Sequence, residues 1–389
     1  MNDRLGIEPD SGLDPLMVHQ LVSAILPAIL TAIVHVKEVA MRAGGILGAA
    51  VLAFGMGAHL VAQSTPHSAI VEQLDRVAAA DDFNGVVSVS RAGQVVLAKG
   101  YGLADRQAGL PNTIRTRFRI ASVTKPITAT AVMLLEQRRA LSLSARLDSF
   151  LEDLPAAWRP LTVHQLLTHT AGLIQPSPAE RTPLANLLDQ RPLIVALQFR
   201  DRPLVAAPGE RYVYSALGYT LLAAVVEKVS GEPFDAFLRS QIFKPLKMND
   251  TGPMGPDATA SVAVGYVRNG DALQPTAPDF QFVGAGHLYS TIEDLQKWDE
   301  AMWRDMLLSR ASIEKMLTPV KPDVGYGYGF NIARVENRPM HGHGGSVDGF
   351  TATLERYPDE ELTIIALSNI NRTPVHNIAI KLAEIVRGN

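Results

Sequence analysis

A serine and a lysine stand three residues apart in Ser122-Val-Thr-Lys125, at the start of an apolar stretch. Pro126 follows directly, and proline is tolerated only in the first turn of a helix, so we predict a helix that begins close to Ser122. Residues three apart share one helix face, which places the lysine amine beside the serine hydroxyl. The free N–H groups of a helix start also favour a developing oxyanion. Together these features are typical of covalent hydrolysis through an acyl-enzyme.

The same spacing also arises where a serine caps a surface helix and the lysine is solvated, so this hypothesis needs partners elsewhere in the chain. Two later segments supply candidates: Tyr214-Ser-Ala216, which precedes an apolar helical pattern, and His341-Gly-His-Gly-Gly-Ser346 near the C-terminus. Tyr214 could instead be a buried tyrosine with a satisfied hydroxyl. His341 and His343 would share one face of a strand, as metal ligands do. Because no third histidine is close in sequence, we expect no metal and no cofactor.

Taken together, these segments resemble the motifs of the serine β-lactamase and penicillin-binding-protein superfamily. The similarity is to the branch of class C β-lactamases, D,D-peptidases and family VIII carboxylesterases. Ser122 and Lys125 match the Ser-x-x-Lys motif, Tyr214-Ser-Ala216 aligns with Tyr-x-Asn/Ser, and His343-Gly-Gly345 aligns with Lys/His-x-Gly. The resemblance covers roughly residues 68–388. Three further segments fit the family pattern: Leu166–Gly172, Pro208-Gly209 and Leu246–Met248.

The resemblance implies a role for each matching residue. Ser122 would be the acylated nucleophile, and Lys125, once desolvated, would serve as its base. Tyr214 would share the proton network, either protonating the leaving group or activating the deacylating water. The backbone N–H groups of Ser122 and Ser346 would form the oxyanion hole. The substrate-binding positions would be His343, Gly345, Ser346 and Ala216.

Two of these positions depart from class C β-lactamases. Ala216 stands where those enzymes carry Asn, and His343 stands where they carry the Lys that recognises a substrate carboxylate. Both changes weaken recognition of penicillin-like carboxylates and are compatible with esterases, so we expect hydrolysis of small carboxylic esters. One alternative is a β-lactamase or D-amino-acid peptidase acting on cell-wall-like peptides. Another is a penicillin-binding-like module that is acylated without turnover. The expected partner is therefore a small ester, amide or β-lactam.

Composition limits the other classes of function. The 389 residues are 47% hydrophobic and 19% charged, which permits a large core and excludes extensive disorder. The net charge of −3, with interspersed signs, gives no nucleic-acid-binding surface. The absence of cysteine excludes disulfides, thiol catalysis, cysteine-based zinc sites and a lipid-anchored cysteine.

Two nearly uncharged stretches, residues 17–36 and 43–64, stand near the N-terminus. The second is typical of a signal peptide that begins at Met41, which would make residues 1–40 an upstream extension and the protein periplasmic or extracellular. The alternative is membrane association through one or two spanning helices, because each stretch approaches the ~20 residues that cross a bilayer. Residues 1–64 are accordingly treated as an N-terminal extension.

The candidate residues must be positioned by strands from both ends of the chain and by helices between them. Period-two and continuous apolar patterns predict strands at 85–90, 94–102, 326–335, 339–344, 349–357 and 362–368. Apolar periodicity and capping signals predict helices at 68–82, 215–230, 233–243, 290–306 and 373–387. Residues 252–277, rich in Gly, Pro and Asp, are predicted to be a loop with one short strand around 262–268.

The economical fold is α+β and β-lactamase/transpeptidase-like. Its central antiparallel sheet combines N- and C-terminal strands, is flanked by helices, and carries an inserted, mainly helical domain. The hydrolase domain would span residues 65–389, with its α/β part at about 65–137 and 318–389 and its helical part at about 138–317. Within the helical part, Thr162-x-x-Gln165 has the form of a capping box, which places His164 at the surface. His169 is expected to make structural hydrogen bonds beside a helix end.

Overall fold

The computed structural model describes residues 71–73, 75–77, 83–181, 191–255, 258, 262–270, 272–276, 282–321 and 323–388. The predicted export signal and its alternative, a membrane segment, lie outside these residues, so export stays a prediction. In the described part of the chain, no helix combines the length and the apolar character needed to cross a membrane.

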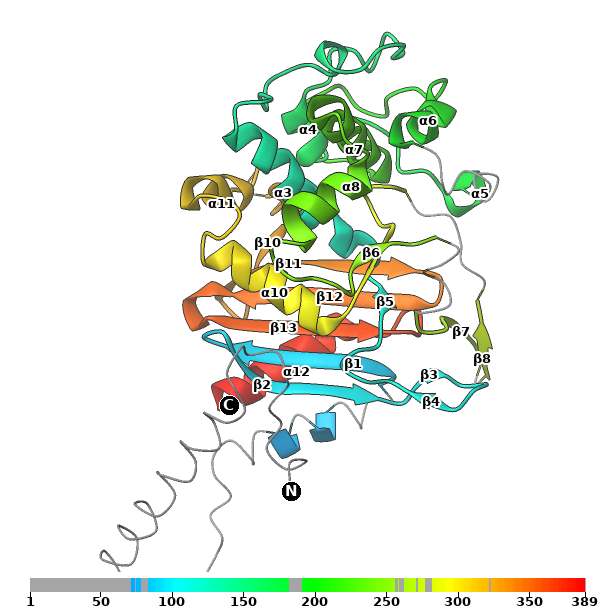
Figure 1. Cartoon of the computed structure of the whole chain (residues 1–389), viewed down its shortest axis with the longest axis vertical. Coiled ribbons are helices and arrows are strands. Elements are labelled where there is room, and N and C mark those ends of the chain that lie inside the picture. Colours follow the sequence, from blue (N-terminus) through cyan, green and yellow to red (C-terminus); the bar gives the residue numbers. More distant parts are fainter. Residues whose placement is uncertain are drawn as a thin grey trace, which may run out of the picture. The chain divides into compact units, whose positions relative to one another are not determined.

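A six-stranded antiparallel sheet forms the centre of the fold, in the order β10-β11-β12-β13-β1-β2 (Figure 1). Its strands are β1 (Gly85–Arg91), β2 (Gln94–Tyr101), β10 (Asn331–Val335), β11 (Arg338–Val347), β12 (Phe350–Tyr357) and β13 (Leu362–Ser368). The N-terminal strand β1 lies directly beside the C-terminal strand β13, with Gly85 opposite Ser368. This arrangement confirms the predicted sheet built from both ends of the chain.

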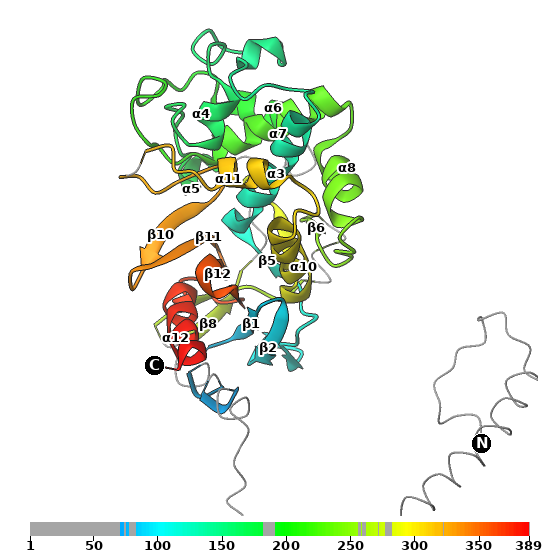
Figure 2. The same ribbon diagram turned by 90° about the vertical axis from the view of Figure 1, so that its left-hand side faces the viewer.

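The two faces of the sheet carry separate hydrophobic cores. Strand β13 is buried along its whole length, and its residues alternate between the cores, with Ile364 on one side and Ile365 on the other. Helix α12 (Val375–Arg387) covers the first face with residues such as Ile378. Helix α10 (Ile292–Trp303) covers the second face, and Figure 2 shows the two helices on opposite sides of the sheet.

The helical part lies beyond the second face, and capping residues mark the start of two of its helices, α7 and α4. Helix α7 has Ser215 as its N-cap, which accepts a hydrogen bond from the N–H of Gly218, and ends at Gly231 with φ 76°. Thr162 and Gln165 form the predicted capping box of α4. The helices of this part are α3 (Thr124–Gln137), α4 (Val163–Leu167), α5 (Pro178–Arg181), α6 (Pro192–Ala196), α7 (Ala216–Ser230), α8 (Phe234–Leu238) and α11 (Arg310–Met316). Short 3₁₀ or π turns are η1 (Ala121–Val123), η2 (Leu147–Ser149), η4 (Leu197–Phe199), η5 (Arg239–Phe243) and η6 (Pro358–Glu360).

A small sheet, in the order β5-β9-β6, connects the two parts of the fold. Its strands are β5 (Phe118–Arg119), β6 (Gly252–Pro253) and β9 (Leu288–Ser290). The N–H of Ile120 donates to the carbonyl oxygen of Leu288 at 3.0 Å, which continues the pairing of β5 with β9. This small sheet therefore fixes the chain just before Ser122.

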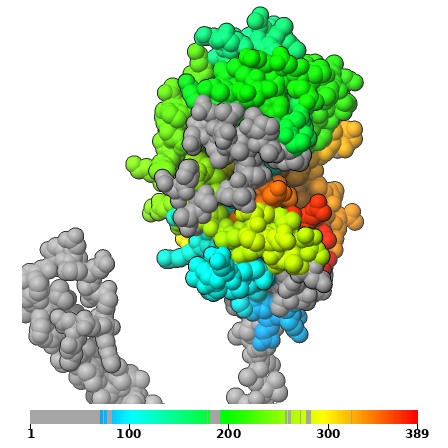
Figure 3. All heavy atoms as spheres, turned by 90° about the vertical axis from the view of Figure 1, so that its right-hand side faces the viewer, coloured from blue at the N-terminus to red at the C-terminus, as the bar shows by residue number. Residues whose placement is uncertain are grey.

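Two predicted elements differ from the structure. The segment predicted as a loop with one strand contains a hairpin of β7 (Tyr266–Asn269) and β8 (Ala272–Pro275), joined through Gly270. The predicted strand at 326–335 is a strand only from Asn331 onward, because positive φ values at Gly325 (61°) and Gly329 (82°) turn the chain. A further short hairpin pairs β3 (Leu103–Asp105) with β4 (Leu110–Pro111). Figure 3 shows the face on which the green helical part and the yellow-green β7–β8 hairpin border the orange C-terminal strands.

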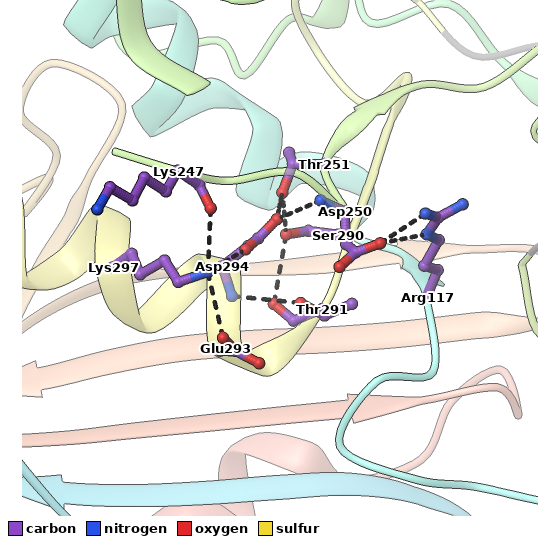
Figure 4. Close-up of polar contacts among 9 residues, drawn as sticks. All are labelled: Arg117, Lys247, Asp250, Thr251, Ser290, Thr291, Glu293, Asp294 and Lys297. Atoms are coloured by element: carbon purple, nitrogen blue, oxygen red, sulfur yellow. Dashed lines mark hydrogen bonds and ion pairs between the residues drawn. The ribbon is translucent and has the colours of Figure 1, made fainter. Parts of the chain in front are cut away.

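A buried carboxylate ties the small sheet to α10 (Figure 4). Asp294, which is 1% exposed, accepts hydrogen bonds from the N–H of Asp250 at 2.7 Å and the hydroxyl of Thr251 at 2.9 Å. Its other oxygen accepts from Nζ of Lys297 at 2.9 Å. The hydroxyl of Thr251 also lies 2.8 Å from that of Ser290 at the end of β9. This Asp294 cluster therefore links the chain entering β6, the end of β9 and the first turn of α10.

We expect Asp294→Ala to lower the free energy of unfolding by about 3 kcal/mol, because it leaves buried donors and the ammonium of Lys297 without their acceptor. Urea unfolding monitored by circular dichroism measures this change. Glu293→Ala is the matched control, since that carboxylate contacts the same lysine at 3.2 Å from an exposed position. The control should cost less than about 0.5 kcal/mol. Equal losses in the two variants would contradict this role for Asp294.

Candidate active site

Ser122 lies in the 3₁₀ turn η1, between strand β5 and helix α3. The predicted helix start is therefore confirmed, with a tight first turn before α3 begins at Thr124. Ala121, the residue before the serine, has φ 47°, a left-handed conformation that is uncommon for alanine. Such strain is held only where the surroundings fix the backbone, and here the small sheet on one side and the buried helix α3 on the other do so.

Three polar side chains meet at the hydroxyl of Ser122. Nζ of Lys125, one helical turn later, lies 3.0 Å from Oγ of Ser122. The hydroxyl of Tyr214 donates to the same oxygen at 2.8 Å, from the segment that leads into α7. The structure thus brings together the three residues that the sequence analysis named as catalytic, although Tyr214 stands 92 positions after Ser122 in the chain.

Burial sets the charge of these groups. Lys125 is 1% exposed, and burial lowers the pKa of its amine from 10.5 to about 7. Its Nζ also donates to the carbonyl oxygen of Ala285 at 2.8 Å and lies 4.7 Å from the ring centre of Tyr214. Burial raises the pKa of Tyr214, which remains a phenol at neutral pH. Near pH 7 the lysine can therefore accept a proton from Ser122 while the tyrosine can donate one.

The edge of strand β11 passes directly beside the Ser122 turn. Strand β10 pairs with β11 only as far as Gly342, so residues 343–347 form an edge that packs against η1. A Cβ on Gly345 would lie 2.4 Å from the carbonyl oxygen of Ile120 and 2.9 Å from the N–H nitrogen of Ser122. Only glycine allows this approach, which leaves the backbone of Ser122 and the strand edge side by side, as in an oxyanion hole. The role of Ser346, which is exposed on this edge, stays a prediction.

A chain of buried hydrogen bonds connects the Tyr214 segment with this edge. The N–H of Ser215 donates to Nδ1 of His169 at 3.1 Å, so the proton of the neutral ring is on Nε2, which lies 3.3 Å from the hydroxyl of Tyr326. On the other side, Nδ1 of His343 must donate to the carbonyl oxygen of Gly344 at 2.5 Å. Nε2 of His343 then accepts from Tyr326 at 3.1 Å. The donor and the acceptor of each hydrogen bond in this series are therefore assigned.

Both histidines in this series of hydrogen bonds, His169 and His343, are neutral. Burial, together with the nearby charge of Lys125, lowers the pKa of His343 to about 3. The same causes, with His343 as a third, hold the pKa of His169 well below its usual value of 6.5. The edge of β11 therefore presents no positive charge at His343 in the neutral pH range.

The comparison with protein-family models matches residues 70–386 to the family described as Beta-lactamase. The chain belongs to the beta-lactamase family. Its fold class and its membership of the serine β-lactamase and penicillin-binding-protein superfamily, both predicted from sequence, are thereby confirmed. The chain is accordingly a serine hydrolase of this superfamily.

The chain is similar to relatives named as penicillin-binding proteins and to one named as an esterase. Penicillin-binding protein 4* of Bacillus subtilis is 30% identical over 332 residues, which cover 78% of this chain and 72% of that protein. Esterase EstB of Burkholderia gladioli is 38% identical over 181 residues, or 43% of this chain and 46% of that protein. The solved structure of the octameric penicillin-binding protein homologue from Pyrococcus abyssi is 30% identical, with a TM-score of 0.72, and the match covers 82% of this chain and 77% of that one.

Other residues at this beta-lactamase-family site were missed or misplaced by the sequence analysis. Gln175 accepts a hydrogen bond from the N–H of Ala216 at 2.6 Å and so caps α7 beside Tyr214. Tyr326 and the carbonyl of Ala285 were also missed, since neither belongs to a motif. His169 makes the structural hydrogen bonds that were predicted for it. His164, placed at the surface by the prediction, is half-buried, because its Nδ1 bonds to the hydroxyl of Tyr328 at 2.8 Å.

The two histidines of strand β11 lie in different environments. The ring of His341 stacks on Trp303 of α10, with ring centres 4.9 Å apart and planes 15° apart. His343 instead bonds to Tyr326. Among the described residues, no three histidine, aspartate or glutamate side chains gather in a way that could hold a metal ion.

We expect Tyr326→Phe to lower the free energy of unfolding by about 2 kcal/mol, because His169 and His343 would each lose a buried partner. Urea unfolding measures the change. Tyr328→Phe is the matched control, since its hydroxyl bonds to the half-buried His164, where water can replace it. The control should lose less than about 1 kcal/mol. If both variants lost the same amount, the hydrogen-bond chain through Tyr326 would have no special importance.

Proposed function

We propose that this protein hydrolyses small carboxylic esters through an acyl-enzyme on Ser122. One observation carries the proposal: Oγ of Ser122 bonds to both the amine of Lys125 and the hydroxyl of Tyr214, while the facing strand carries the neutral His343. The first half of this observation supports covalent catalysis, and the second half supports an uncharged substrate.

In the proposed acylation, the neutral amine of Lys125 takes the proton of Ser122 as Oγ attacks the ester carbonyl. The tetrahedral oxyanion forms between the N–H of Ser122 and the edge of β11. As the C–O bond breaks, the hydroxyl of Tyr214 protonates the leaving alkoxide, and the proton held by Lys125 restores the phenol. A water molecule then attacks the acyl carbonyl and gives up one proton to the same pair. As the bond between the acyl carbon and Oγ breaks, the pair returns this proton to Oγ, and the carboxylic acid leaves.

The preference for esters follows from what stands beside this centre. β-Lactams and cell-wall peptides present a carboxylate, and His343, with a pKa of about 3, offers it no positive charge. Ala216 has no amide group to bind a substrate amide or the lysine. The relative named Esterase EstB also supports an ester substrate, although less than half of each chain aligns.

The test compares steady-state turnover of p-nitrophenyl butyrate with that of nitrocefin. We expect continuous ester hydrolysis and a much lower kcat/KM for nitrocefin. The double variant Ala216→Asn, His343→Lys should shift this ratio toward nitrocefin, because it introduces the amide and the positive charge that the wild type does not carry at these positions. Faster hydrolysis of nitrocefin by the wild type would favour a β-lactamase, and a single stoichiometric burst would favour a module without turnover.

A further inference from the structure

The carbonyl that receives Lys125 belongs to a turn, Phe282–His287, that is held by several elements. The hydroxyl of Thr220 on α7 donates to the carbonyl of Val283 at 2.9 Å. The hydroxyl of Thr128 on α3 donates to the carbonyl of Gly284 at 2.6 Å. The N–H groups of Ala285 and Gly286 both donate to the carbonyl of Phe282 at 3.0 Å. The carbonyl groups of Phe282, Val283 and Gly284 are therefore each held by a hydrogen bond.

A side chain holds a further N–H of the turn, that of Gly284. It donates to Nδ1 of His287 at 3.2 Å, and Nε2 of the same ring lies 2.8 Å from Oδ1 of Asp235 on α8. Because Nδ1 accepts, the ring proton is on Nε2 and is donated to the carboxylate of Asp235. His287 is buried, and its ring also lies 5.9 Å from that of Phe234. Asp235 thus selects the tautomer of His287 that can hold Gly284.

No residue with a side chain fits at Gly284. The turn therefore cannot be made rigid by replacing this glycine. Gly284 has φ 79°, and a Cβ there would lie 2.6 Å from the carbonyl oxygen of Tyr219 and 2.9 Å from Cβ of Ala223. The turn therefore has glycine, the residue type with the greatest backbone freedom, at a position that must be constant, one residue before the carbonyl that contacts Lys125. The ring of His287 supplies the constraint that glycine cannot.

We infer that Asp235 and His287 are positioning residues for the proposed base: by holding the N–H of Gly284, they fix the carbonyl of Ala285 against Nζ of Lys125. This inference rests on the proposed role of Lys125 in ester hydrolysis. The bond to Ala285 holds the amine 3.0 Å from Oγ of Ser122, where its neutral form can accept the serine proton. Release of the turn would allow the amine to rotate away from the serine.

Two substitutions test the roles of the two ring nitrogens of His287 separately. Oδ1 in His287→Asn stands at the same distance along the side chain as Nδ1, so it can still accept from Gly284. The amide of His287→Gln instead reaches the place of Nε2, so it keeps the contact with Asp235 and leaves the N–H of Gly284 without an acceptor. We expect His287→Gln to lower kcat for p-nitrophenyl butyrate by about 100-fold with little change in KM, as a misplaced catalytic group does. His287→Asn should stay close to wild type.

Asp235→Ala provides a second route to the same result, because Asp235 is partly exposed and its loss removes only the choice of tautomer. Its kcat should fall by less than that of His287→Gln. The matched control is His376→Gln, which breaks another histidine–carboxylate pair, to Glu355 at 2.6 Å, between α12 and β12. Its kinetics should be unchanged. Thermal unfolding of all four variants confirms that each is folded at the assay temperature.

The outcomes are distinguishable. A low kcat in His287→Gln with near-normal activity in His287→Asn supports the inference. Equal losses in these two variants would mean that His287 supports the fold and does not orient the turn, and unchanged activity in both would overturn the inference while leaving the proposed function intact. If wild type and Ser122→Ala hydrolysed the ester at the same rate, the proposed function itself would fail.

Discussion

Ser122→Ala is expected to lower kcat for p-nitrophenyl butyrate by about 10⁶-fold, the scale on which serine hydrolases lose activity with their nucleophile. The reason is that Oγ forms the bond to the substrate, and neither Lys125 nor Tyr214 can replace it. Lys125 and Tyr214 keep their contacts with other residues in the variant. Lys125, for example, still donates to the carbonyl of Ala285. The unfolding midpoint should therefore stay near that of wild type.

Intact-mass spectrometry gives the sharpest measurement. Wild type quenched during turnover of a slow ester should carry one acyl group on the peptide that contains Ser122, and the alanine variant should carry none. Ser240→Ala, which changes an exposed serine on the helical part, is the control for the substitution itself and should acylate normally. An acyl group found on another residue would move the nucleophile away from Ser122.

Lys125→Met is expected to lower kcat/KM by about 10⁴-fold, because it removes the proposed base while preserving the apolar length of the side chain. In wild type only the neutral amine is active, so kcat/KM should rise with pH and level off above the lysine pKa of about 7. The pH profile of kcat/KM between pH 5 and pH 9 measures this. In the variant the residual activity should lose this acidic limb, and a variant that kept the same limb would show that another group titrates.

The same substitution is expected to raise the free energy of unfolding at neutral pH. The pKa of Lys125 is about 7 in the folded protein and near 10.5 when exposed, so the unfolded chain binds its proton more readily. The contribution of Lys125 to the free energy of unfolding therefore becomes less favourable as the pH falls from about 10.5 to about 7. It does not change further below that range. Urea unfolding at pH 7 and pH 10 should show this loss in wild type and a smaller one in Lys125→Met. Identical pH dependence in both would contradict the lowered pKa of Lys125 in the folded protein.

The features that could be predicted from sequence are those set by local geometry. Ser122 and Lys125 are one helical turn apart, and Thr162 and Gln165 cap their own helix, so spacing alone determines how they meet. The terminal strands followed from their apolar patterns. The association of Tyr214 with Ser122 required the family resemblance, because nothing local relates positions 92 residues apart.

The rest depends on contacts between distant segments. Ala285 receives Lys125 across 160 positions, and Tyr326 reaches His169 across 157, so neither carries a local signal. Alternating tyrosine and glycine at 326–329 imitates a strand, while the backbone turns there at Gly325 and Gly329. His287 could have been noticed as a polar residue inside a Gly- and Ala-rich segment, but its partner Asp235 could not.

The pairing of β1 with β13 determines when this protein can fold. The hydroxyl of Ser368 donates to the backbone of Asn84, 284 residues earlier, and β1 lies between β2 and β13 in the finished sheet. During synthesis, the hairpin of β1 and β2 therefore has an open edge until almost the whole chain has been made. Contacts of such long range slow folding, and an open strand edge is where chains associate wrongly. A chain cut before β13 would leave β1 at the edge of an incomplete sheet. The strands made first can therefore complete the sheet only after β13 has been made.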